Sequence, residues 1–245
     1  IKYEMKPLSS LEKVFPDETP VYRMECQMLS GLWGETVSFQ VAYTGDFVMR
    51  ERLDVRVVSE LAEHVHVRTV EMVPVGRATN GIVDDNYLKT ISGLYPDLLK
   101  DLKDGKVIVY SRQWRSLWVD VDITNEIPAG EHEIELQLIK EGEVVCSAKQ
   151  KVTVIGTELP KLDIMHTEWM HADCLADYYH VEVFSEEHWK LLENYFQEYV
   201  KRDCNMMLTP LFTSPLDTAI GLERTTCQLI DVEVKDGEYV FGFEK

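Results

Sequence analysis

The spacing of apolar residues changes once along this chain, close to Gly156, and that change constrains the fold more than any other feature of the sequence. Before Gly156, apolar and polar residues alternate in short segments, with the period of two that is typical of half-buried β-strands. Residues 36–43 are the clearest example, because Phe39 and Val41 fall on one face between polar neighbours. The first part of the chain is therefore predicted to be built from β-strands.

Six further segments show the same pattern. They are residues 53–58, 65–75, 107–110, 116–123, 133–139 and 144–154. Glycine-containing turn sequences such as Asp104-Gly105 and Glu141-Gly142 separate them. Seven or eight short strands at this spacing predict an antiparallel β-sandwich over residues 1–156. We expect its two sheets to bury Phe39, Val41, Trp118 and Leu136.

One connection in the predicted sandwich is long. Residues 76–104 are expected to form a loop that carries Asp84 and Asp85. Loops of this length in compact domains are usually functional or packed on a neighbouring domain. A calcium site at the two aspartates lacks the D-x-D-x-D-G pattern, so a solvated turn is favoured.

Strand and helix signals alternate after Gly156. Residues 163–169 are predicted to form a strand, and Ser185 is a good N-cap for a helix that ends near Arg202. Residues 205–208 resemble a short buried strand. Together they predict one β-α-β unit with parallel strands and a right-handed crossover. A β-hairpin is predicted around Asp236-Gly237 near the end of the sequence.

Composition excludes several classes of partner. The formal net charge is -18, from 43 acidic and 25 basic residues, which argues against nucleic acid. No segment approaches the roughly 18 apolar residues that a membrane span requires. The five cysteines are widely spaced and odd in number, which favours reduced thiols and a cytoplasmic setting. The sequence begins with Ile1 and not Met, so an earlier leader peptide that has been removed is an open alternative.

Several motifs resemble one group of bacterial glycoside-hydrolase-like proteins, many of them known only as a domain of unknown function. The motifs are His171-Ala172-Asp173-Cys174-Leu175-Ala176-Asp177-Tyr178-Tyr179, Phe184-Ser185-Glu186-Glu187-His188-Trp189, Leu208-Thr209-Pro210-Leu211-Phe212, Pro215-Leu216-Asp217-Thr218 and Glu223-Arg224-Thr225. The chain is similar to the glycoside hydrolase family 123 N-acetylgalactosaminidases. This resemblance implies an N-terminal sandwich followed by a catalytic TIM barrel.

The resemblance implies that residues 157–245 are the N-terminal portion of a (β/α)₈ barrel. A complete barrel needs about 200 to 250 residues, and only about 85 follow Leu159. No residues correspond to the acidic pair that the resemblance places on a later barrel strand, so the catalytic residues stay unknown. We expect a fragment of a longer protein whose remainder completes the barrel; a degenerate stand-alone form is the alternative.

The implied activity is retaining, substrate-assisted hydrolysis of glycosides of 2-acetamido sugars, with a carbohydrate as partner and no cofactor. This fragment alone is expected to be inactive. The alternative is a non-catalytic sandwich that binds carbohydrate or a neighbouring domain. Continuation of the open reading frame into further β-α units and an acidic pair would favour the enzyme.

The substrate-binding candidates follow the two predicted barrel strands, at the carboxyl end where barrel active sites form. They are His171, Asp173, Tyr178, Asp217 and Arg224. The polar residues would bind sugar hydroxyls, and Tyr178, like Tyr179 and Trp169, would offer an aromatic face. The competing interpretations are a capped turn at Asp173, an internal ion pair at Arg224 and core packing of the aromatic rings. Arg224 is expected to pair with Asp173 or Asp217.

A metal site is not predicted. His166, Glu168, His171 and Asp173 form an H-x-E-x-x-H-x-D string, but the segment looks extended and matches no strong zinc signature. Cys174 has no evident activating base in the sequence, which favours a buried and inert thiol.

Overall fold

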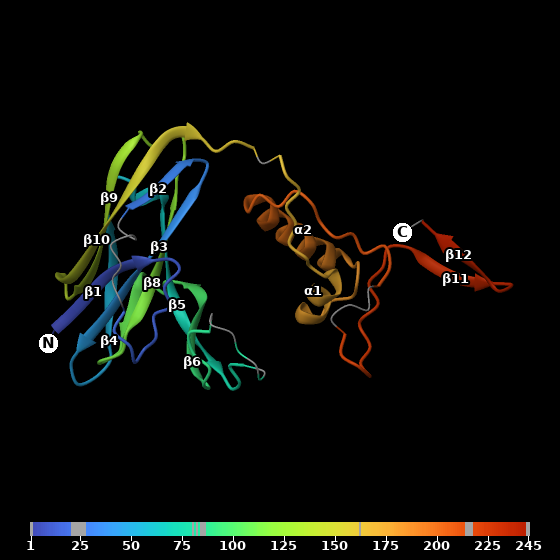
Figure 1. The fold of residues 1–245 in the computed structure, drawn as a ribbon, viewed down its shortest axis with the longest axis horizontal. Helices are drawn as coiled ribbons and strands as arrows, with labels where there is room; N and C mark the ends of the chain where they lie inside the picture. Colours follow the sequence, from blue (N-terminus) through green and yellow to red (C-terminus); the bar gives the residue numbers. More distant parts are fainter. Residues whose placement is uncertain are drawn as a thin grey trace. The chain divides into compact units, whose positions relative to one another are not determined.

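The computed structural model of the protein describes residues 2–20, 28–79, 81, 83, 87–161, 163–213 and 218–243 (Figure 1). The chain divides into two compact units, Ile1–Leu159 and Pro160–Lys245. The observed division falls close to the change of apolar spacing at Gly156. Asp84, Asp85 and Asp217 lie outside the described residues.

Two five-stranded sheets make up the first unit. One has the order β1 (Lys2–Ser9), β3 (Thr36–Asp46), β8 (Arg115–Asp122), β5 (Val65–Val75) and β6 (Gly93–Asp101). The other has the order β2 (Met28–Trp33), β10 (Glu143–Glu158), β9 (Gly130–Lys140), β4 (Glu51–Val58) and β7 (Lys106–Val109). A short 3-10 turn, Ala62–His64, precedes β5. The mostly β architecture is confirmed, with one correction: β2 and β10 pair in parallel.

The core lies between the two sheets. Phe39, Val41 and Leu136 are at most 1% exposed, as predicted. Trp118 was predicted wrongly: it is only partly buried, and its Nε1 donates to Asp120 Oδ1 at 2.7 Å. The physical reason is the period of two along β8. Leu117 is fully buried in the core, so its neighbour Trp118 faces the other side of the sheet.

The two edge strands of the first sheet, β1 and β6, were not predicted from the sequence. β1 contains Pro7 and β6 contains Pro96, and proline lacks the N–H that a central strand needs. An edge strand tolerates this loss because one of its sides is not paired within the sheet. The predicted loop over residues 76–104 is therefore partly wrong, since β6 pairs antiparallel with β5.

The second unit contains two helices and a hairpin. α1 spans Ala172–Tyr179 and α2 spans Glu186–Lys201, with the Ser185 hydroxyl accepting from His188 N–H as the predicted N-cap. β11 (Asp231–Lys235) and β12 (Glu238–Gly242) form the predicted hairpin. Asp236 and Gly237 have φ of 55° and 86°, as a two-residue turn requires. Among the described residues, no helix is long and apolar enough to cross a membrane.

The two predicted barrel strands are wrong as strand assignments. Residues 163–169 and 205–208 are all described, and neither segment is a β-strand. They nevertheless lie side by side: Asn205 N–H donates to the His166 carbonyl at 3.0 Å, and the Asn205 amide nitrogen donates to the Ile164 carbonyl at 2.8 Å. Local bonds centred on one asparagine replace the continuous ladder that defines a strand.

Candidate functional site

The site is built on the first turn of α1, which sequence reasoning treated as a loop. His171 occupies the N-cap position, and Asp173 lies in the first turn, where a carboxylate is favoured by the helix dipole. Ala172 and Leu175 are buried in one apolar cluster with Leu192 of α2. The apolar residues at this spacing, together with the early aspartate, were the signal that could have predicted the helix.

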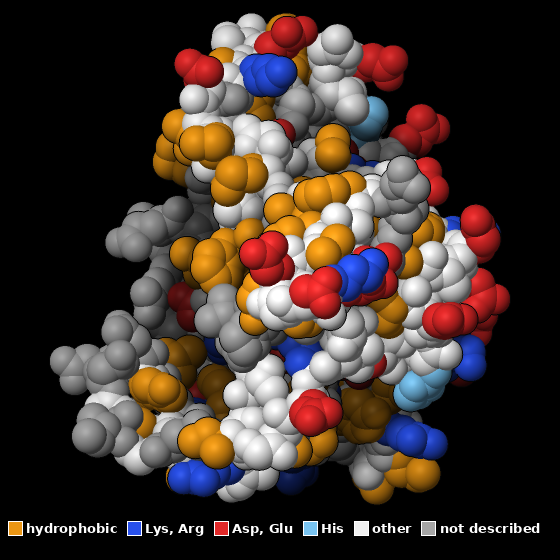
Figure 2. Space-filling view, turned by 90° about the vertical axis from the view of Figure 1, so that its right-hand side faces the viewer, with side chains coloured by type: hydrophobic (Ala, Val, Ile, Leu, Met, Phe, Trp, Pro, Cys, Tyr) orange, Lys and Arg blue, Asp and Glu red, His pale blue; other side chains and the backbone are white. Residues whose placement is uncertain are grey.

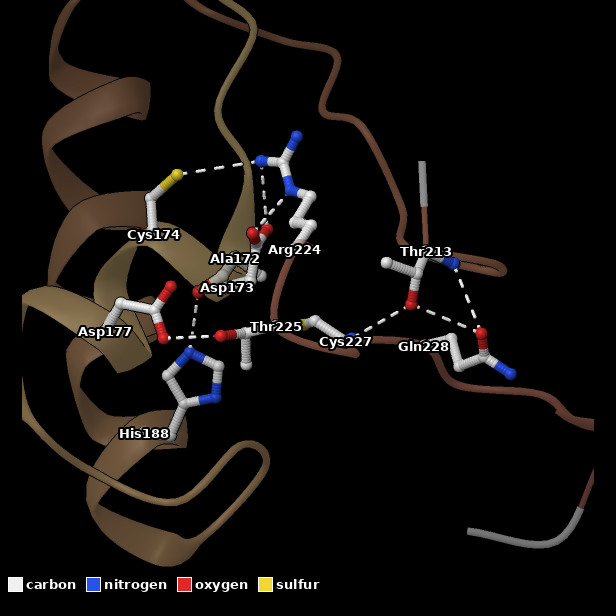
Figure 3. A network of polar contacts seen from close by, with 10 residues as sticks. All are labelled: Ala172, Asp173, Cys174, Asp177, His188, Thr213, Arg224, Thr225, Cys227 and Gln228. Atoms are coloured by element: carbon white, nitrogen blue, oxygen red, sulfur yellow. Dashed lines mark hydrogen bonds and ion pairs between the residues drawn. The ribbon is translucent and has the colours of Figure 1, made fainter. Parts of the chain in front are cut away.

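His188 connects the starts of the two helices and was not predicted as a site residue. Its side chain is fully buried. Phe184 N–H donates to Nδ1 at 2.9 Å, so the ring proton is on Nε2, which lies 2.9 Å from the Ala172 carbonyl oxygen (Figure 3). Both ring nitrogens are thereby used, and the peptide that precedes Asp173 is held in place.

Asp173 and Arg224 form a two-bond ion pair. Arg224 Nε donates to Asp173 Oδ2 at 2.5 Å, and Nη2 donates to Oδ1 at 3.2 Å (Figure 3). The two side chains are 9% and 11% exposed, Asp173 being the more buried. The hydrogen bonds that Arg224 donates to Asp173 raise the pKa of the Arg224 guanidinium, against the opposing effect of burial. The expected pairing of Arg224 with Asp173 is present.

A second bond ties the same segment to α1. Thr225 Oγ1 donates to Asp177 Oδ1 at 2.8 Å. Asp173 and Asp177 are four residues apart, so both carboxylates lie on one face of the helix. Arg224 contacts Asp173 and Thr225 contacts Asp177 on that face, so the 224–225 segment is held along α1.

These side chains border a pocket of about 200 Å³. Its lining includes Trp169, His171, Asp173, Phe212, Arg224 and Cys227. An ion pair thus lies at the wall of a cavity that is otherwise mostly apolar, which is the usual composition of a small-molecule site.

The pocket gathers three of the five predicted site residues. His171, Asp173 and Arg224 line it, whereas Tyr178 is 77% exposed and stands outside the described lining. Tyr178 instead packs edge-on against Tyr179, with ring centroids 5.0 Å apart. Of the three aromatic candidates from the sequence, Trp169 lines the pocket, and Phe212 lines it as well.

The cysteines near the pocket differ from expectation. Cys174 was expected to be buried, but it is exposed, and its Sγ lies 3.6 Å from Arg224 Nη2. It occupies the third position of α1, on the solvent side. Cys227 is the buried thiol, and burial raises its pKa to about 11. The Cys227 thiol is therefore protonated near neutral pH and is a poor nucleophile.

Among the residues that the structure describes, no three His, Cys, Asp or Glu side chains are grouped to hold a metal ion. The polar side chains of the pocket lining are the Asp173–Arg224 ion pair, His171, Thr209, Thr213 and Cys227, and the rest of the lining is mostly apolar. Such a set can hydrogen-bond a neutral polar ligand and pack against its apolar faces.

Comparison with known proteins identifies the relatives. Residues 169–245, which contribute the whole pocket lining, match the family model for the glycoside hydrolase 123 catalytic domain. A solved structure of a family 123 glycoside hydrolase from Clostridium perfringens, studied for glycolipid glycan hydrolysis, matches 99% of this chain with a TM-score of 0.71 and 12% sequence identity. Residues 169–245 are similar to the family 123 catalytic domain, and the fold of the chain is similar to that of the Clostridium protein. The family resemblance expected from the motifs is confirmed.

The similarity to the Clostridium protein covers only part of that protein's length. This chain spans 43% of the length of the Clostridium family 123 protein, and at 12% identity the structural similarity concerns the fold alone. The N-terminal domain of PorA and the macrocyclization enzyme AvmM of alchivemycin A biosynthesis match 63% and 66% of this chain, and 99% and 93% of their own. Their identities are 10% and 11%, and their TM-scores of 0.30 and 0.32 are too low to support an inference. No curated protein matches the sequence significantly.

Proposed function

We propose that this chain is the N-terminal part of a glycoside hydrolase that acts on 2-acetamido sugars, and that its pocket binds hydroxyl groups of the sugar. The observation that carries the proposal is the Asp173–Arg224 pair, because it lies at the wall of a pocket within the segment related to family 123. A largely buried ion pair is weak evidence for stability alone, so its place at a cavity favours a role in binding.

The pair is suited to neutral sugar hydroxyls. A carboxylate offers about four acceptor positions, and Arg224 occupies two of them on Asp173. The remaining acceptor capacity of Asp173 can receive sugar O–H groups. His171 adds a ring that can donate or accept, and Trp169 and Phe212 supply apolar surface for the C–H faces of the sugar ring.

The proposed reaction is retaining and substrate-assisted. The acetamido oxygen of the substrate attacks the anomeric carbon, while one carboxylate orients the amide and another protonates the leaving oxygen. Both carboxylates would come from the remainder of the barrel, outside residues 1–245. The role of the described pocket would be to position the sugar relative to these two carboxylates. Cys227 would not act as a nucleophile.

Residues 1–245 alone should not hydrolyse an aryl N-acetylhexosaminide, because they would lack the general acid. The measurement is release of the aryl alcohol by purified protein, with a mock-purified preparation as the blank. Turnover that Asp173→Asn or Arg224→Lys abolishes would contradict the placement of the acidic pair.

Replacing Arg224 tests the binding role directly. Arg224→Lys keeps the charge but loses the planar two-bond fork to Asp173, so affinity for N-acetylgalactosamine should fall about tenfold. Isothermal titration of the 245-residue chain provides the measurement, and Arg202→Lys, the same change at the end of α2, is the matched control. Equal affinities for both variants and the unmodified chain would contradict the proposal.

A further inference from the structure

The hairpin β11–β12 has one apolar face. Its register places Val232 opposite Phe241 and Val234 opposite Tyr239, so these four side chains share a side. All four are exposed, from 38% for Val232 to 71% for Tyr239. The other side carries Asp231, Glu233, Lys235 and Glu238 beside Val240. We call the group of Val232, Val234, Tyr239 and Phe241 the hairpin face.

Backbone bonds fasten the base of this hairpin to the rim of the pocket. Leu229 N–H donates to the Pro210 carbonyl at 2.8 Å, and Ile230 N–H donates to the Leu211 carbonyl at 3.3 Å. Pro210 lines the pocket itself. The hairpin therefore starts from the pocket wall.

Side chains reinforce this attachment. Cys227 N–H donates to Thr213 Oγ1 at 3.0 Å, and Thr213 Oγ1 donates to Gln228 Oε1 at 3.2 Å (Figure 3). Thr213 and Cys227 both line the pocket. The segment that leads into the hairpin is thus bonded to the pocket loop through consecutive residues, Cys227 and Gln228.

The apolar surface continues from the pocket onto the hairpin. Phe212 lines the pocket, and its ring packs edge-on against Phe241 with centroids 6.1 Å apart. Tyr239 lies two residues from Phe241 on the same face, about 7 Å further along the strand. The surface view in Figure 2 shows hydrophobic side chains exposed among acidic and basic ones.

We propose that the hairpin face binds the second sugar ring of an oligosaccharide whose terminal 2-acetamido sugar occupies the pocket. The inference rests on the proposed function and names the part of the substrate on the leaving-group side. Sugar rings present apolar C–H faces that pack on aromatic rings, and a tyrosine adds a polar hydroxyl. A neutral ligand is favoured because acidic residues dominate the other side of the hairpin and the net charge of -18 repels anions.

The test compares two ligands that differ by one sugar. The chain is titrated with N-acetylgalactosamine and with a disaccharide that carries N-acetylgalactosamine at its non-reducing end, linked to galactose. We expect the disaccharide to bind about tenfold more tightly, equivalent to about 1.4 kcal/mol. Tyr239→Ser should lose this gain and keep the affinity for the monosaccharide. Val240→Ser, on the opposite side, is the matched control and should keep both affinities.

Three other results would contradict the inference, and they differ in what they say about the proposed function. Equal affinities for the two ligands, with monosaccharide binding intact, would overturn the hairpin inference and leave the proposed function standing. Absence of binding by both ligands would overturn the proposed function as well. Light scattering measures the oligomeric state of the chain and of the variant. A dimer that Tyr239→Ser converts to a monomer would identify the hairpin face as a protein contact and overturn the inference. Phe241→Ser is the second variant, with amide exchange of β11 and β12 showing that the hairpin persists.

Discussion

His188→Ala should destabilise the C-terminal unit by about 3 kcal/mol. The substitution removes the partners of two backbone groups, Phe184 N–H and the Ala172 carbonyl, and each unpaired buried group costs about 1 to 3 kcal/mol. It also leaves a cavity at a fully buried position. Since α1 carries Asp173, loosening its first turn should release the ion pair with Arg224 as well.

Hydrogen exchange of the backbone amides measures this effect unit by unit. Amides of α1 and α2 that exchange by opening of this unit should exchange about 100-fold faster in His188→Ala, whereas those of the β-sandwich should be unchanged. Lys190→Ala, at an exposed position of the same helix, is the control and should change protection little. Unchanged exchange in α1 would show that His188 does not hold the two helix starts together.

Phe39→Ala should have the largest effect in the sandwich, about 3 to 5 kcal/mol. Phe39 is fully buried on β3 and belongs to the main apolar cluster between the sheets. Its strand pairs with both β1 and β8, so a cavity there affects three strands of the first sheet. The loss would remove a large part of the 5 to 15 kcal/mol that holds a typical domain folded.

The measurement is urea unfolding of the 245-residue chain, followed through exchange of the β3 and β8 amides so that the first unit is observed separately. Val48→Ala is the matched control, because that side chain is 98% exposed and should change stability by less than about 0.5 kcal/mol. Similar midpoints for the two variants would show that Phe39 is not central to the core.

The central strands of the sandwich could be predicted because burial on one face imposes a period of two. Residues 36–43 and 65–75 show that alternation, and β3 and β5 formed there. Trp118 shows the limit of this reasoning: the pattern gives alternating faces, but an amphipathic indole with a nearby acceptor such as Asp120 is stable on the outer one. The edge strands β1 and β6 were missed because proline weakens the strand signal.

The ion pair at the pocket could be predicted from the sequence, but the local structure around it could not. Asp173 and Arg224 were placed together because the segments that carry them were expected to be neighbours, and they do pair. The neighbouring segments, however, contact each other through Asn205 and not through a strand ladder. His188 could not be identified from the sequence, because its role depends on backbone groups of Phe184 and Ala172 that only folding brings to it.

The most direct test of the account is to locate where the chain binds a 2-acetamido sugar. Titration of ¹⁵N-labelled protein with N-acetylgalactosamine, followed by two-dimensional NMR, reports every perturbed amide and the Arg224 Nε–H. The account predicts that the perturbed signals come from the first turn of α1, from the Thr213 region and from Arg224. Perturbations confined to residues 1–159 would contradict it and favour a carbohydrate-binding sandwich.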